Sequence, residues 1–91
     1  MKLSCKVKIK NQLGLHARPA TVIVRILQES KSSVHFTHKK ETINARSIMS
    51  ILMLAASKNS QILIDIEGED AEKTMKRLVD AFDNQFEESH D

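Results

Sequence analysis

The spacing of the apolar residues changes between two periods along this chain, and that change limits the folds it can adopt. Between residues 2 and 10, apolar side chains occupy every second position, which predicts a strand with one buried face. Residues 17–29 instead place apolar side chains three and four positions apart, as a helix does. Pro19 lies near the start of that segment, where a missing N–H is tolerated. The chain therefore begins with a strand and then a helix.

The middle of the chain predicts a hairpin and a short helix. Apolar residues at 34, 36, 43 and 45 indicate two short strands, joined by a polar turn over residues 38–41. Ser47 then has the position of an N-cap. The short helix that it starts is expected to have Ile48, Ile51, Leu52 and Ala55 on one face.

The last third predicts one more strand and one more helix. Isoleucines alternate with other residues over 61–67, and Gly68 closes the strand. Asp70 is a candidate cap for a helix whose stripe runs from residue 71 to 86. The order is thus β-α-β-β-α-β-α. A four-stranded antiparallel sheet with its helices on one face, an α+β fold, accommodates that order most economically.

Length and composition favour one small domain without a membrane segment. The 91 residues fit a single core, which we place at residues 1–88 with a short polar tail at 89–91. The longest apolar run covers six residues, far below the ~20 that a spanning helix needs. Cys5 is the single cysteine, so no internal disulfide can form. We expect a cytoplasmic protein with no cofactor and no membrane insertion, and we expect Cys5 to be a small core residue.

Charge is spread unevenly along the chain. Through residue 60 there are eleven Lys or Arg against two acidic residues, whereas the remainder has three against ten. Such a surface can steer a charged partner, or it can simply be two solvated faces. The basic part also raises the alternative of a small nucleic-acid-binding module. Three Phe, no Tyr or Trp and no GxxG loop argue against that alternative.

One histidine has a setting that suits chemistry. The four histidines, His16, His35, His38 and His90, have no metal-like spacing, and we expect no metal site. His16 lies where a loop meets a helix start, and a first helical turn presents N–H groups and positive dipole to an anion. The amides of Ala17 and Arg18 can form such a nest, and the Arg18 guanidinium can add a charged fork. From the residues alone, an ordinary capping histidine beside an exposed arginine is the simpler interpretation.

Three strings decide between these interpretations. GLHARPA at 14–20, NARSIMS at 44–50 and GEDAEKTMKRL at 68–78 occur in the order and spacing of one family. The chain resembles the histidine-containing phosphocarrier protein HPr of the phosphoenolpyruvate-dependent sugar phosphotransferase system, over nearly its whole length. The resemblance implies an open-faced β-sandwich, in which three helices cover one face of four antiparallel strands.

The same resemblance implies the chemistry and the partners. His16 matches the histidine that Enzyme I phosphorylates on Nδ1, and Arg18 matches the arginine that contacts the phosphoryl group. The phosphoryl group would then pass to the IIA components of sugar permeases. The protein is expected to act as a monomer. An HPr-like regulatory protein that docks to partners with little role in transport is an alternative that the sequence leaves open.

Two further features follow from the resemblance. Ser47 matches the serine that HPr kinase/phosphorylase modifies, although a plain N-cap explains it as well. Ile48, Met49, Leu52 and Met53 cannot all face the core, so some are expected to form a docking patch rather than the excess of a wide buried stripe. The chain departs from the family in glycine content, since Ser50, Ala55 and Asn59 stand where glycine is frequent.

Overall fold

The computed structural model describes residues 1–87, and its elements follow the predicted order. The predicted domain end at residue 88, the tail at 89–91 and His90 lie outside the described residues. The elements are β1 (Lys2–Lys8), α1 (Ala17–Gln28), β2 (Ser33–His38), β3 (Glu41–Asn44), α2 (Ile48–Met53), β4 (Gln61–Glu67), α3 (Ala71–Asp83) and the short 3-10 turn η1 (Gln85–Glu87).

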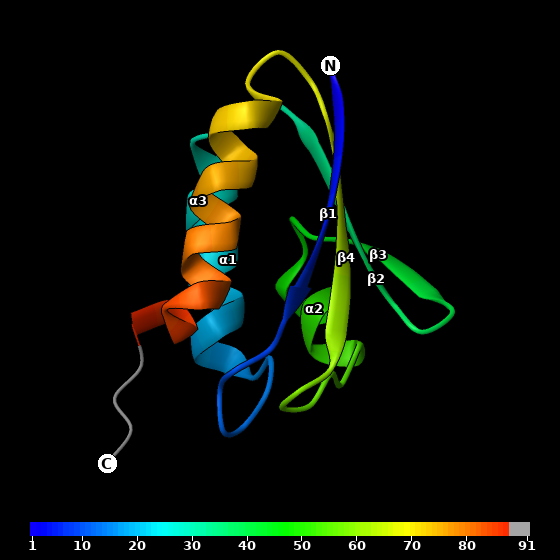
Figure 1. Cartoon of the computed structure of the whole chain (residues 1–91), viewed down its shortest axis with the longest axis vertical. Coiled ribbons are helices and arrows are strands. Elements are labelled where there is room, and N and C mark those ends of the chain that lie inside the picture. The colour runs from blue at the N-terminus through cyan, green and yellow to red at the C-terminus, as the bar shows by residue number, and fades with distance from the viewer. Residues whose placement is uncertain (88–91) are drawn as a thin grey trace.

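The four strands form one antiparallel sheet in the order β1-β4-β2-β3. Figure 1 shows α1 and α3 side by side along one face of this sheet, while its other face carries no helix. The third helix, α2, packs against α1 and β3. The predicted α+β architecture, a four-stranded sheet with three helices, is confirmed. No helix within residues 1–87 is long and apolar enough to cross a membrane.

The core lies between the sheet and the helices. Ile62, Ile64 and Ile66 of the central strand β4 are fully buried, as their alternation predicted. Phe82 of α3 packs edge-on against Phe36 of β2 and against Phe86, with ring centroids 5.8 and 4.9 Å apart. The inner stripes of α1 and α3 and the alternate residues of β2 and β4 thus share one core.

Strand β1 is shorter and less buried than predicted. It ends at Lys8 rather than at residue 10, although Ile9 is fully buried. Leu3, Cys5 and Val7 face the helices but are half-buried, because β1 is an edge strand with a neighbour on one side only. Cys5 therefore packs against the core without being enclosed by it.

The single face predicted for α2, which extended to Ala55, is wrong in part. Ile51 is fully buried and Leu52 is half-buried, but Ile48 and Ala55 are exposed. The helix spans six residues, and Ala55 follows it with a φ of +50°, so the chain leaves the helical path before that position. Leu54 fills the core in its place, with 5% of its surface exposed.

Asp70 has the N-cap position of α3 but does not act as a side-chain cap. Its carboxylate instead accepts hydrogen bonds from the hydroxyls of Ser30 and Ser32 and from the backbone N–H of Lys31. These bonds, the one from Ser32 above all, lower the pKa of Asp70 to about 2. Asp70 thereby fastens the loop between α1 and β2 to the start of α3.

Candidate functional site

His16 forms the boundary between the first loop and α1. It is the N-cap residue, with extended backbone angles of φ −89° and ψ −165°. Its carbonyl accepts a hydrogen bond of 3.1 Å from the backbone N–H of Ala20, which starts the helix. The half-buried imidazole makes no side-chain cap hydrogen bond to the first turn. The predicted position of His16 at a helix start is therefore the one observed.

The first turn of α1 leaves backbone N–H groups without acceptors inside the helix. Ala17 and Arg18 are its first two residues, so their N–H groups have no intrahelical acceptor. Pro19, the third residue, has no N–H to contribute and fixes the backbone angle of the turn. Two amides and the positive end of the helix dipole therefore come directly after His16 in the chain.

Arg18 is exposed beside this turn. Its guanidinium makes no hydrogen bond or ion pair with any residue of the described chain. It lines a surface hollow together with Ala17, Thr21, Arg25 and the C-terminal Phe86 and Glu87. An arginine so placed can turn toward an anionic group on the His16 ring and bind it by charge-assisted hydrogen bonds.

A close backbone approach fixes the loop that carries His16. Gly14 has a φ of +69°, and a Cβ at this position would lie 2.3 Å from the carbonyl oxygen of Ala56. The next residue, Leu15, donates its N–H to that same oxygen at 3.0 Å and is itself buried. The sequence indicated only a flexible point at Gly14. The sequence around Gly14 does not predict the contact with Ala56, because the two residues lie far apart in the chain.

Ser47 caps α2 as predicted. Its hydroxyl accepts a hydrogen bond of 3.1 Å from the backbone N–H of Ser50. The neighbouring Arg46 donates hydrogen bonds of 2.7 Å to the carbonyls of Leu27, Ser30 and Ser32. Arg46 therefore links the start of α2 to the end of α1 and the loop after it. The sequence analysis did not identify this role of Arg46.

The apolar residues of α2 divide between core and surface. Met49 and Met53 are 68% and 72% exposed, and Ile48 is 39% exposed. Leu52 is half-buried and packs against the core. A wide buried stripe therefore does not explain the methionines. Leu13, in the loop before His16, is 73% exposed and belongs to no periodic pattern, so the sequence did not single it out.

The other described histidines lie elsewhere. His35 and His38 belong to β2, in the sheet, and not to the loop that holds His16. Among residues 1–87, no three His, Cys, Asp or Glu side chains converge as the ligands of a metal ion would.

The chain is similar in sequence and in structure to known proteins of one family. A family model described as "PTS HPr component phosphorylation site" matches residues 3–84. Phosphocarrier protein HPr of Chlamydia pneumoniae is 46% identical over 80 residues, which cover 88% of this chain and 74% of that one. The protein of the same name from Chlamydia muridarum is 42% identical over 86 residues, covering 94% and 83%. A crystal structure of HPr-C-His from Thermoanaerobacter tengcongensis superposes with a TM-score of 0.91 at 34% identity, over 96% of this chain and 98% of that one.

Proposed function

This chain belongs to the HPr family of phosphocarriers of the phosphotransferase system, and on that premise we propose that His16 is its phosphorylated residue. In the proposed cycle, His16 accepts a phosphoryl group that Enzyme I derives from phosphoenolpyruvate and passes it to the IIA components of sugar permeases. The observation that carries the proposal is the position of His16 at the N-cap of α1, beside the first-turn amides.

The chemistry needs few protein groups. The lone pair of the neutral imidazole Nδ1 forms a bond to phosphorus while the bond between phosphorus and the donor breaks. The negative charge of the phosphoryl group then lies beside the amides of Ala17 and Arg18. The exposed Arg18 guanidinium adds charge-assisted hydrogen bonds. In the second transfer, the acceptor attacks phosphorus and the N–P bond breaks, which regenerates His16.

Partner binding is assigned to the apolar surface of α2. Ile48, Met49 and Met53 are exposed, and Leu52 contributes at their edge. Since α2 packs against α1, a partner that reaches His16 can cover these side chains at the same time. We propose that Enzyme I and the IIA components dock here in turn, on a cytoplasmic monomer.

Regulation is assigned to Ser47. HPr kinase/phosphorylase is the proposed modifying enzyme. A phosphate on this N-cap would meet the amides of the first turn of α2, so the helix can accommodate it. The same phosphate would stand next to Ile48 and Met49, where a docking partner would have to desolvate it. Modification is therefore expected to weaken docking while the fold remains intact.

The direct test is a reconstituted transfer chain. The protein is incubated with Enzyme I and labelled phosphoenolpyruvate, separated from both, and then mixed with a purified IIA component. We expect the label to enter the protein and to move on to the IIA component. A protein that never becomes labelled, or whose label no IIA component removes, contradicts the proposed function.

A further inference from the structure

The sheet face without helices gathers cationic side chains at one end. Lys6 and Lys8 of β1 point to this face, since they alternate with the half-buried residues that face the helices. Lys6 lies opposite Leu63 of β4, and Leu63 lies opposite Thr37 of β2. This part of the open face is on the far side of the sheet from α1 and α3 (Figure 1).

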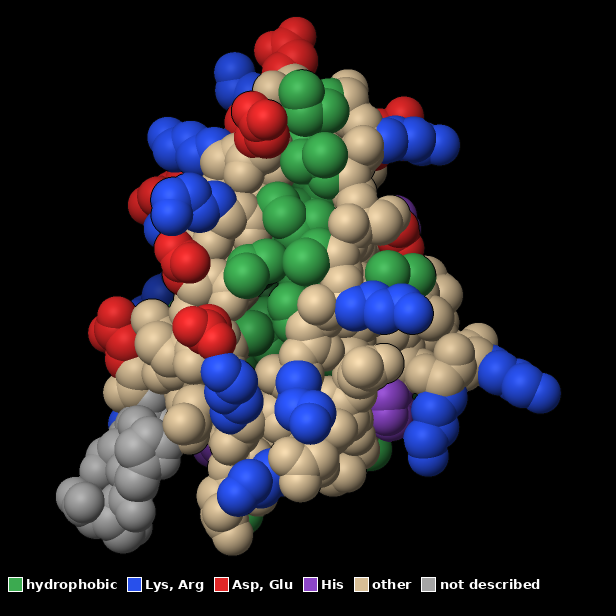
Figure 2. Space-filling view, in the orientation of Figure 1, with side chains coloured by type: hydrophobic (Ala, Val, Ile, Leu, Met, Phe, Trp, Pro, Cys, Tyr) green, Lys and Arg blue, Asp and Glu red, His purple; other side chains and the backbone are tan. Residues whose placement is uncertain are grey.

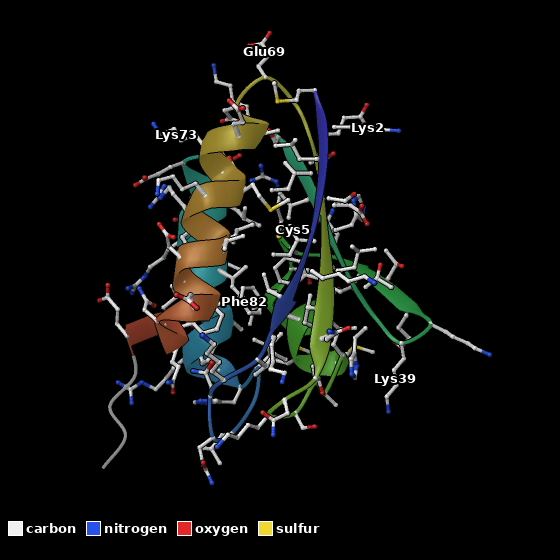
Figure 3. All side chains as sticks on the ribbon, viewed as in Figure 1. Lys2, Cys5, Lys39, Glu69, Lys73 and Phe82 are labelled. Carbon is white, nitrogen blue, oxygen red and sulfur yellow. The ribbon has the colours of Figure 1, made fainter. Side chains whose placement is uncertain are left out.

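A surface hollow lies among these strands, which we name the open-face hollow. Its lining consists of two lysines, one histidine, two hydroxyl side chains, an amide and a half-buried leucine: Lys6, Lys39, His38, Thr37, Ser60, Gln61 and Leu63. No carboxylate lines it. Figure 2 shows basic side chains along the lower right of the molecule, beside the β2–β3 hairpin, and Figure 3 shows Lys39 projecting from the end of that hairpin.

The positive charge of the open-face hollow is not compensated within the described chain. The side chains of Lys6 and Lys39 make no ion pair or hydrogen bond with residues 1–87. Lys10, by contrast, pairs with Asp83 at 2.6 Å. Like charges that share a hollow repel one another, so an anionic partner gains from binding here.

We propose that the open-face hollow binds a carboxylate-rich segment of a protein partner. The hollow is broad, its donors come from three strands and two loops, and Leu63 supplies an apolar floor. These features fit an extended acidic chain better than a single compact anion. A nucleic acid fits poorly, because Phe36, Phe82 and Phe86 are all buried and cannot stack on bases. The proposal does not depend on His16.

The test uses a poly-L-glutamate peptide as the probe. Amide chemical shifts of the full-length, isotope-labelled protein are followed during titration, for the wild type and for the double variant Lys6→Gln/Lys39→Gln. The control, Lys31→Gln/Lys73→Gln, removes the same charge from exposed positions outside the hollow; Figure 3 shows Lys73 on α3, on the helix side of the molecule.

We expect the shifts to centre on residues 6, 37–39 and 60–63. The double variant should bind about fivefold more weakly, since two exposed ion pairs are lost, while the control binds as the wild type does. Shifts centred on residues 16–25, or equal weakening in both variants, would overturn the proposal. So would tighter binding of a single-stranded RNA oligonucleotide at the same residues.

A second readout separates this surface from phosphotransfer. The variant Lys6→Gln/Lys39→Gln should accept phosphate from Enzyme I at the wild-type rate, because neither lysine belongs to the His16 loop, α1 or α2. A slower rate in this variant but not in the control would assign the hollow to the Enzyme I interface and contradict a separate acidic partner.

Discussion

The backbone N–H of Leu15 donates a hydrogen bond of 3.0 Å to the carbonyl oxygen of Ala56, and this bond joins the His16 loop to the segment after α2. Gly14 makes the approach possible, because any side chain there would collide with the same oxygen. The candidate phosphorylation site and the candidate docking helix are therefore built on one shared backbone contact. Changes at that contact should affect both.

Gly14→Ala is expected to damage stability and transfer together. Its Cβ would lie 2.3 Å from the Ala56 oxygen at a φ of +69°, so the loop must shift. We expect a loss of about 1–3 kcal/mol in the free energy of unfolding, measured in urea, and slower phosphorylation of His16. Gln12→Ala, in the same loop but exposed, is the matched control. A Gly14→Ala protein with wild-type stability and rate contradicts this account.

Ala55→Gly is expected to stabilise the protein. Ala55 has a φ of +50°, a left-handed conformation that costs alanine but not glycine. Urea unfolding should show a gain of about 1 kcal/mol. Ser50→Gly is the control, because Ser50 lies inside α2 and glycine should cost about 0.5–1 kcal/mol there. If the free energy of unfolding changed with the same sign in both variants, the left-handed conformation of Ala55 would not explain the change.

Asp70→Asn is expected to remove a pH-dependent stabilisation. The pKa of Asp70 is lowered from 3.8 to about 2, so its ionised form is favoured in the folded state. The stabilisation is therefore fully present above the unfolded pKa and disappears as pH falls from about 4 to about 2. Urea unfolding across this range should show wild type and variant converging at low pH. Glu69→Gln, at the exposed neighbouring position, is the control; a constant difference between wild type and Asp70→Asn would contradict the linkage.

Ser47→Asp is expected to fold normally and to accept phosphate more slowly. Aspartate is itself a good N-cap, whereas its charge opposes docking at Ile48 and Met49. Circular dichroism should be unchanged, and the KM for phosphorylation by Enzyme I should rise more than kcat falls. Ser47→Ala should show the reverse, with a loss of about 1 kcal/mol in stability and ordinary transfer. Full activity of Ser47→Asp would leave Ser47 as a structural cap alone.

The sequence correctly predicted the helices, strands and caps that depend on the local pattern of apolar and capping residues. The period of the apolar residues placed α1 and β4 almost at their observed limits, and the cap at Ser47 was predicted correctly. The start of α3 was also correct, but the helix ends at Asp83, whereas its predicted stripe ran to residue 86. Prediction from the sequence failed where contacts between distant parts of the chain determine the local structure. The exposure of Ala55 follows from the early end of α2 at Met53, and the carboxylate of Asp70 bonds serines of another loop instead of capping α3.

The position of the phosphate after reaction with Enzyme I and phosphoenolpyruvate tests the central claim most directly. Mass spectrometry under conditions that preserve acid-labile phosphate should find one phosphoryl group, on His16. His16→Ala should take up none and keep the wild-type circular dichroism spectrum, whereas His35→Ala, with its exposed side chain in β2, should be labelled like the wild type. Phosphate on His35 or His38, or labelling that persists in His16→Ala, would contradict the account.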